Sequence, residues 1–323
     1  MTLTKRASGW VLTAAVAVVA GSYVTTPTSA QSKPAAKPAP AKAPQSRPGE
    51  PVGGFADRLY ILDGGIGRAA DAGQWTNMML PPNTPIDITA WAHLIKHGDT
   101  WMLFDTSTND MYAKLPGGYG TGIHWIKTEA QTLAPQFKAI GITPDDIKYI
   151  GISHNHPDHT GNVEMFKKAE VLIQKREYDF MFKNGIGPTG PPNFVGADGK
   201  PLPVMDKDHP HKLLDGDYDV FGDGSVILFF TAGHTLGAQI CLVRLRNTGY
   251  VLLSGDTVHL RSNFDTRRIP RVGGANDENQ WLWSVPIAFE RVAALMSFYK
   301  AQLWVHHDME DYKGRKLAPK YYD

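Results

Sequence analysis

The chain has 323 residues, of which 42% are hydrophobic and 20% are charged, a mixture typical of globular proteins and not of disordered or fibrous ones. Its single cysteine, Cys241, excludes intramolecular disulfide bonds and metal sites built mainly from thiolates. The formal net charge is only +1, so there is no basic excess that would attract a polyanion. We therefore expect no nucleic-acid partner.

The chain begins with the three parts of a secretory signal. Two basic residues are followed by an apolar run over 10–21 and by small residues at Thr28 and Ala30, which predicts cleavage after Ala30. The apolar run is shorter than the roughly 20 residues of a membrane-spanning helix, so we expect no stable membrane insertion after cleavage. Residues 1–30 are thus expected to direct export, to the periplasm or the extracellular space.

A linker is expected next. Residues 31–51 contain six prolines and no large apolar side chain, a composition that has nothing to bury and predicts an extended segment. Residues 52–323 show no internal repeat and no second linker of this length. We interpret them as one domain.

Short apolar runs alternate with stretches of helical periodicity along this domain. A helix is expected over 130–140, capped by Gly141, and another after Pro286. A turn at Gly98 predicts a hairpin, and Asp63-Gly64-Gly65 is expected to end the first strand. The expected strands cover 59–62, 91–96, 100–104, 147–152, 226–231, 250–253 and 303–305.

Four of these strands end at a histidine or a carboxylate. The residues that follow them are Asp105, His154, Asp256 and His307. Because polar groups that follow several strands gather at one edge of a sheet, this pattern predicts a layered α/β domain with its site along that edge.

The strongest motif is the run His154, His156, Asp158 and His159, four ligand-type residues within six positions. On an extended segment, residues two apart point the same way, so His154 and His156 can bind one ion together. Asp158 and His159 fall where the chain is expected to turn into a helix that begins near Asn162, and they can face a second ion. Without a cation, burying this cluster would cost much hydration free energy.

Each pair needs a third ligand, because three protein ligands leave an open position for water and substrate. His234 is the candidate for the first ion and His307 for the second. Asp256 has two oxygens and suits the position between the ions. For isolated histidines such as His93, a structural role is expected instead. His209 and His211 are assigned to a long Gly- and Pro-rich loop over 185–211, which forms either a wall of the site or a surface insertion.

This arrangement resembles the metallo-β-lactamase superfamily. The matching features are His154-x-His156-x-Asp158-His159, Gly233-His234, Gly255-Asp256 and His307, in the superfamily's order. The resemblance implies an α/β fold of the αββα sandwich type, with two central mixed sheets flanked by helices, and a dinuclear, usually zinc, centre. It implies that Asp158, His159 and His307 bind one ion, that His154, His156 and His234 bind the other, and that Asp256 bridges them. It also implies that Asp105 orients a ligand histidine.

Within the superfamily, the chain is most similar to the N-acyl-homoserine lactonases. The similarity rests on 59–65, 174–178, 215–218, 231–237 and His307-Asp308. Asp256 disfavours true β-lactamases, which tend to have cysteine or serine there, and His156 disfavours the diiron oxidoreductases. One departure is His259, at the position where lactonases often have a tyrosine that polarises the lactone carbonyl.

The resemblance therefore implies a metal-dependent hydrolase that opens a lactone ring by attack of a hydroxide bridging two divalent ions. Asp158 would pass the proton and His259 would donate to the carbonyl oxygen. The substrate would be a small molecule, an N-acyl-homoserine lactone in quorum quenching, and the alternative is another ester, a glyoxalase II-like thioester or a β-lactam. Zinc fits the ligands, although Mn, Fe and Co would also be held. The oligomeric state stays open, with a homodimer among the alternatives.

Overall fold

The structure of the chain is a computed structural model, and it describes residues 53–75, 80–81, 83–115, 117–120, 122–182, 205–269 and 284–323. The expected signal peptide and linker lie outside the described residues, as does most of the loop over 185–211. No helix in the described ranges has the length and apolar character needed to cross a membrane.

Two mixed β-sheets form the centre of the described domain. The larger sheet has seven strands, in the order β4-β1-β2-β3-β5-β6-β7. Its β4-β1-β2-β3 part is antiparallel, and the strands from β3 to β7 run parallel. The strands are β1 (Arg58–Ala69), β2 (Ile86–His97), β3 (Thr100–Phe104), β4 (Ile123–Ile126), β5 (Ile147–Gly151), β6 (Glu170–Gln174) and β7 (His211–Leu214).

The second sheet has five strands, in the order β12-β11-β10-β9-β8. Only β11 and β12 pair in parallel. The strands are β8 (Tyr218–Asp219), β9 (Val226–Phe230), β10 (Gln239–Leu245), β11 (Gly249–Leu253) and β12 (Gln302–Trp304).

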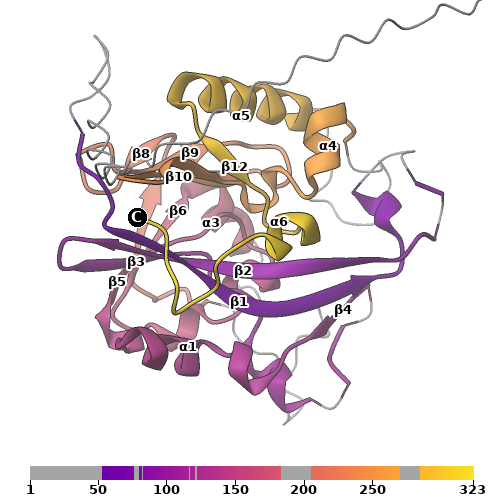
Figure 1. The fold of residues 1–323 in the computed structure, drawn as a ribbon, viewed down its shortest axis with the longest axis horizontal. Coiled ribbons are helices and arrows are strands. Elements are labelled where there is room, and N and C mark those ends of the chain that lie inside the picture. The colour runs from indigo at the N-terminus through magenta and orange to yellow at the C-terminus, as the bar shows by residue number, and fades with distance from the viewer. Residues whose placement is uncertain are drawn as a thin grey trace, which may run out of the picture. The chain divides into compact units, whose positions relative to one another are not determined.

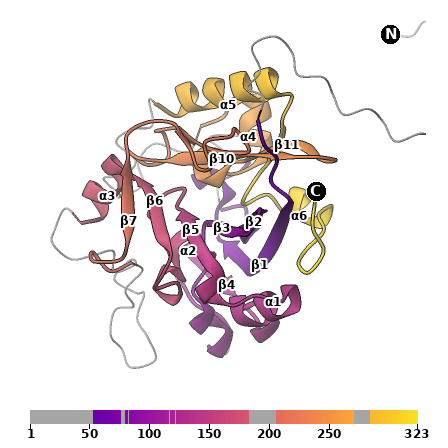
Figure 2. The same ribbon diagram turned by 90° about the vertical axis from the view of Figure 1, so that its left-hand side faces the viewer.

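Helices lie on the outer faces of both sheets. In Figure 1, α4 and α5 cover the five-stranded sheet, and α1 lies on the far side of the larger sheet. The turned view separates α3 from α1 along the larger sheet (Figure 2). The α-helices are α1 (Leu133–Ile140), α2 (Pro157–Thr160), α3 (Lys175–Met181), α4 (Arg261–Thr266), α5 (Val285–Tyr299) and α6 (Met309–Lys313). Short 3-10 helices are η1 (Ala72–Gln74), η2 (Asp110–Lys114), η3 (Glu129–Gln131), η4 (Pro144–Asp146), η5 (Val163–Met165) and η6 (Gly255–Thr257).

Alternation along the strands divides the core into layers. On β2, Trp91 and Ile95 pack between the sheets, whereas Ala92 and Leu94 face α1 and the other outer elements. On β10, Cys241 lies in the layer between the sheets and Leu242 packs towards α5. Side chains that alternate in this way bury both faces of each sheet. The result is the expected αββα sandwich.

Each expected strand is found, although β2 begins earlier than expected, at Ile86, and Gly141 caps α1 with φ of +88° as expected. One local prediction was wrong and another was only partly right. The first strand does not end at Asp63-Gly64-Gly65, because β1 continues to Ala69 through a bulge between Asp63 and Ile66. A Cβ at Gly64 would collide with the Ala90 carbonyl oxygen, so this glycine allows a close approach between chains and does not mark a turn.

The expectation of a helix that begins near Asn162 is met only by the short 3-10 helix η5, whose N-cap is Asn162. The helical turn forms earlier, as α2, with Pro157 in its first turn and with Asp158 and His159 on the helix itself. Asn162 instead donates from its side-chain amide to the carbonyl oxygens of Thr106 and Thr108, at 2.7 and 2.8 Å. These bonds attach the segment after α2 to the chain that follows β3, and a regular α-helix does not start there.

Candidate metal centre

The loops that follow five strands meet at one edge of the sandwich. Asp105 follows β3, and the run from His154 to His159 follows β5 in the larger sheet. The second sheet contributes the residues after β9, β11 and β12, which are His234, Asp256 and His307. The structure brings together all seven of the expected ligands, from both sheets.

Three imidazole rings form the first ligand group. The Nε2 atom of His234 lies 3.2 Å from Nε2 of His154 and 3.0 Å from Nδ1 of His156. The Oδ2 atom of Asp256 lies 3.4 Å from the same His234 nitrogen. Ligand atoms of these four residues all fall within 4.8 Å of one another, a spacing that one ion can span.

The second group lies on the other side of Asp256. Its Oδ1 atom is 3.0 Å from Nε2 of His159 and 3.1 Å from Nε2 of His307. Asp158 completes the group, with Oδ2 at 3.4 Å from the His307 nitrogen and 3.7 Å from the His159 nitrogen. Oδ1 faces the second group alone, whereas Oδ2 lies near His234 and also 3.2 Å from Nε2 of His307, so this carboxylate stands between the two groups.

The electrostatics of the first group and of Asp256 favour cation binding. Burial would raise the pKa of Asp256, but His307 and His159 hold it well below its usual range, so this carboxylate is charged. Burial lowers the pKa of His154 and of His234 well below the usual histidine value, so both rings are neutral. Neutral imidazoles and an ionised carboxylate are the forms that bind metals.

The donor set fits a metal on steric grounds as well. Ligand nitrogens about 2.0–2.1 Å from one tetrahedral ion lie roughly 3.4 Å apart. The observed separations of 3.0 and 3.2 Å approach that value. His159 Nε2 and Asp256 Oδ1 are buried and have no hydrogen-bond partner in the described part of the chain. A cation between the groups would satisfy these atoms.

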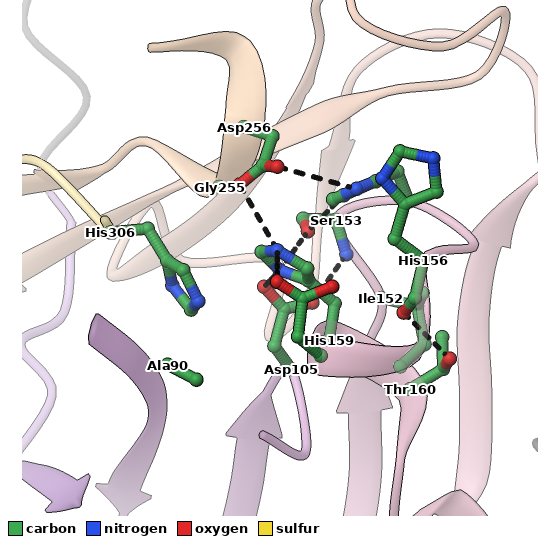
Figure 3. Close-up of polar contacts among 12 residues, drawn as sticks. Ala90, Asp105, Ile152, Ser153, His156, His159, Thr160, Gly255, Asp256 and His306 are labelled. Atoms are coloured by element: carbon green, nitrogen blue, oxygen red, sulfur yellow. Dashed lines mark hydrogen bonds and ion pairs between the residues drawn. The ribbon is translucent and has the colours of Figure 1, made fainter. Parts of the chain in front are cut away.

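The back of each ligand ring is held by the fold. Asp105 accepts the backbone N–H of Ser153 at 2.7 Å and contacts Nδ1 of His159 at 2.8 Å (Figure 3). Nδ1 of His307 lies 2.6 Å from the carbonyl oxygen of Thr89 on β2. An N–H on each Nδ1 that donates to these oxygens leaves Nε2 free to face the ions. Asp105 thus occupies the orienting position that the resemblance implies.

Sequence reasoning did not assign a role to His306. Its ring stacks on His159 with 4.3 Å between centroids, and ligand atoms of His159, His306 and His307 lie within 4.8 Å of one another. In Figure 3 it lies on the other side of His159 from His156. Among the ion pairs of the described residues, Asp256 contacts His307 and not His306. We therefore keep His307 as the candidate ligand, and the adjacent pair of histidines was the sequence signal for this neighbour.

His259 also reaches the centre. Its Nε2 atom lies 3.2 Å from Oδ2 of Asp256, and burial lowers its pKa, so the ring is neutral. Trp75 stacks on the His259 ring at 5.9 Å and lies 6.4 Å from the His307 ring. Trp125 is 6.2 Å from the His307 ring. The two tryptophans, which the sequence did not single out, form an apolar wall beside the second group.

Two histidines fall elsewhere. His209 lies 3.2 Å from the carbonyl oxygen of Ala169, and His211 stacks on Tyr178 at 4.5 Å. Neither belongs to the metal-type groups of the described residues.

Two mixed sheets packed between helices, with histidines and aspartates gathered from both sheets at one edge, define a metal-binding α/β hydrolase. The chain matches the metallo-beta-lactamase superfamily over residues 87–290 and belongs to that superfamily. It is accordingly a metal-dependent hydrolase.

Curated proteins of similar sequence include N-acyl homoserine lactonases. The chain is 30% identical over 241 residues to the N-acyl homoserine lactonase AttM of Azorhizobium caulinodans, covering 71% of this chain and 86% of that protein. It is 27% identical over 275 residues to an N-acyl homoserine lactonase of Bacillus cereus, covering 82% of this chain and 98% of the relative.

Solved structures share the fold. An N-acyl homoserine lactone hydrolase, solved with the product N-hexanoyl-L-homoserine at its catalytic metal centre, superposes with a TM-score of 0.67 at 23% identity. The match covers 83% of this chain and all of that one. AidC, a dizinc quorum-quenching lactonase, gives a TM-score of 0.57 at 16% identity, over 84% of this chain and 97% of its own.

Proposed function

We propose that the protein is a dinuclear lactonase that hydrolyses N-acyl-homoserine lactones. The observation that carries the proposal is the Asp256 carboxylate, which lies between the two ligand groups, with Oδ2 3.4 Å from His234 and Oδ1 3.0 and 3.1 Å from His159 and His307. The lactonases among its relatives support the substrate class. We propose zinc as the metal, because imidazole and carboxylate ligands suit it.

The reaction adds water across the ring ester. The water oxygen bonds to the carbonyl carbon, the bond from that carbon to the ring oxygen breaks, and a proton reaches the ring oxygen to give an open hydroxy acid. When bound, divalent ions lower the pKa of water and polarise the carbonyl.

The chain's own residues supply the remaining tasks. Nε2 of neutral His259 lies 3.2 Å from Asp256 in this structure, and in the substrate complex a proton on it is placed to donate to the carbonyl oxygen. The Asp158 carboxylate, between His159 and His307, is the group placed to carry the proton towards the leaving oxygen. Trp75 and Trp125 limit access of water on one side.

A second candidate function follows from His259. Because imidazole replaces the tyrosine expected in a lactonase, an active site for another ester, a thioester or a β-lactam is the alternative.

Turnover measurements separate the two candidates. Protein purified without chelator is assayed in a pH-stat with homoserine lactones of short and long acyl chains, a thioester and a β-lactam, and its metal content is determined. We expect about two ions per chain and the highest kcat/KM on a homoserine lactone. Turnover of only the thioester or the β-lactam would favour the second candidate, and activity without bound metal would reject both.

We also propose that the protein is exported, since residues 1–30 match a cleavable signal. Sequencing the N-terminus of protein from the periplasm or the medium should give Gln31. Recovery of the chain only from the cytosol, beginning at Met1, would contradict export.

A further inference from the structure

A buried carboxylate outside the two ligand groups lies directly beneath the first of them. Glu177 is in the first turn of α3, immediately after β6, and its side chain is fully buried. Acidic side chains are almost never fully buried unless they are paired, so its partners explain its position. The proposed reaction gives this residue no task.

Its two oxygens bind two different loops. Oε1 accepts the backbone N–H of Asn155 at 2.8 Å, and Asn155 stands between the candidate ligands His154 and His156. Oε2 accepts the Thr235 hydroxyl and the backbone N–H of Gly237, each at 2.8 Å. Thr235 directly follows His234. One carboxylate therefore holds both the loop after β5, from the larger sheet, and the loop after β9, from the second sheet.

The packing at Gly237 depends on the same contact between Glu177 and the loop after β9. A Cβ at Gly237 would lie within 2.8 Å of three atoms of Glu177. Only glycine lets the loop after β9 approach α3 this closely. Close approach and three hydrogen bonds together fix the distance between the two loops.

The contact bears on the first ligand group because its three histidines come from these loops alone. Their nitrogens stand 3.0 and 3.2 Å apart, and small loop displacements would separate them. Three donors to one carboxylate are strong hydrogen bonds, and removing one partner leaves the others buried and unsatisfied. Burial raises the pKa of Glu177, and its hydrogen bonds and the nearby His156 oppose that rise.

We propose that Glu177 is a positioning residue that presets the geometry of His154, His156 and His234 and so sets the affinity of the first metal position. The inference rests on the proposed metal-binding role of this group. Glu177 reaches the ion only through the two loops.

The test replaces Glu177 by glutamine, which keeps the length and volume of the side chain but turns one acceptor into a donor facing N–H or O–H groups. Metal-free protein is titrated with Zn²⁺ in competition with a chromophoric chelator, and with Co²⁺ while the visible absorption spectrum is recorded. We expect Glu177→Gln to lower the affinity for one of the two ions by about 10- to 100-fold, the range for residues that orient metal ligands. The Co²⁺ spectrum of that ion should change.

Combining Glu177→Gln with a second substitution shows which of the two metal positions it affects. In His307→Ala, which leaves the first group intact, Glu177→Gln should still weaken binding by the same factor. In His234→Ala, where the remaining ion relies on the second group, it should change Kd by less than about threefold, since the coupled interaction is already lost.

A destabilised control separates positioning from general stability. Val292→Ala removes buried volume from the core under α5, outside the contacts of Glu177, and should lower Tm without changing metal affinity. If Glu177→Gln lowers Tm but binds both ions with the wild-type Kd and spectrum, the proposal is overturned. Equal weakening in the His307→Ala and His234→Ala backgrounds would overturn it too. These measurements need no substrate, so absent lactone turnover with normal metal binding would count only against the proposed function.

Discussion

At the scale of single residues, His259 occupies the position where the resemblance to lactonases leads us to expect a tyrosine. Its Nε2 atom lies 3.2 Å from the Asp256 carboxylate, and its ring packs against Trp75. These contacts place it beside both ligand groups without making it part of either. A neutral imidazole there can donate one hydrogen bond, as a tyrosine hydroxyl would.

His259→Ala should therefore lower kcat about 10- to 1000-fold with a much smaller change in KM, the range for one lost oxyanion donor. His259→Tyr should retain much of the activity, because it restores a donor. Steady-state kinetics on a homoserine lactone at matched metal content measure both. Near-normal turnover by His259→Ala would remove this residue from the mechanism.

Asp256 is the residue on which both ligand groups converge. Replacing it with serine removes the oxygens that face His234 on one side and His159 on the other. Asp256→Ser should lower the affinity for both ions together, by about 10-fold or more each. A residue that binds the metal directly matters at least as much for affinity as one that orients a ligand. Zn²⁺ titration checks this, with His211→Ala as the control that should change neither ion. Loss of one ion alone would show that Asp256 does not bridge.

At the scale of elements, α2 is the short helix that carries Asp158 and His159, and its position depends on the chain after β3. Gly161 donates its N–H to the Ser107 carbonyl at 3.0 Å and accepts from the Asn109 side chain at 2.6 Å. A Cβ at Gly161 would lie within 2.7 Å of backbone atoms of Ser107, Asn109 and Pro157. Backbone on both sides cannot rotate away, so the helix would have to move.

Gly161→Ala should destabilise the fold by about 2 kcal/mol through this overpacking. It should also lower the affinity for the second ion by about 10-fold. Gly141→Ala is the matched control. Its Cβ meets open space, but φ of +88° costs about 1 kcal/mol in a non-glycine residue, so stability falls while metal affinity stays unchanged. Denaturant unfolding and Zn²⁺ titration give both quantities. Wild-type affinity in Gly161→Ala would mean that α2 does not set the second group.

At the scale of the whole described domain, the ligand groups connect the two sheets. The larger sheet supplies the residues after β5, and the second sheet supplies His234, Asp256 and His307. Apolar side chains join the sheets elsewhere, but at this edge the contacts are polar. Ions that bind only the folded arrangement stabilise it by mass action.

Removing the metal with a chelator should therefore lower Tm by roughly 8 °C or more, the shift expected for about 4 kcal/mol of ligand stabilisation in a domain of this size. Adding Zn²⁺ or Co²⁺ back should restore Tm. Calorimetry or thermal unfolding followed by circular dichroism measures the change. An unchanged Tm after verified metal loss would show that the ions do not hold the sheets together.

Many local features of this protein could be predicted from its amino-acid sequence. The positions of seven of the twelve described strands and of α1 and α5, the turn at Gly98, the cap at Gly141 and the ligand-rich run from His154 to His159 follow from periodicity and residue type over a few positions. The strands β4, β6, β7, β8 and β10 were not predicted. Because polar residues followed several strands, the site's place at a sheet edge was also predictable. The resemblance to the superfamily supplied the order in which distant ligands combine.

Which side chains meet across distant loops depends on how the chain packs in three dimensions. It carried β1 through Gly64 and Gly65, formed the helical turn at Pro157 and placed His306 against His159. Glu177 contacts Asn155 and Gly237, which lie 22 and 60 positions away along the chain. No local pattern encodes such meetings, because they depend on how the sheets pack and on which positions lack a Cβ. The residue types came from the sequence, and the distances that make them one site came from packing.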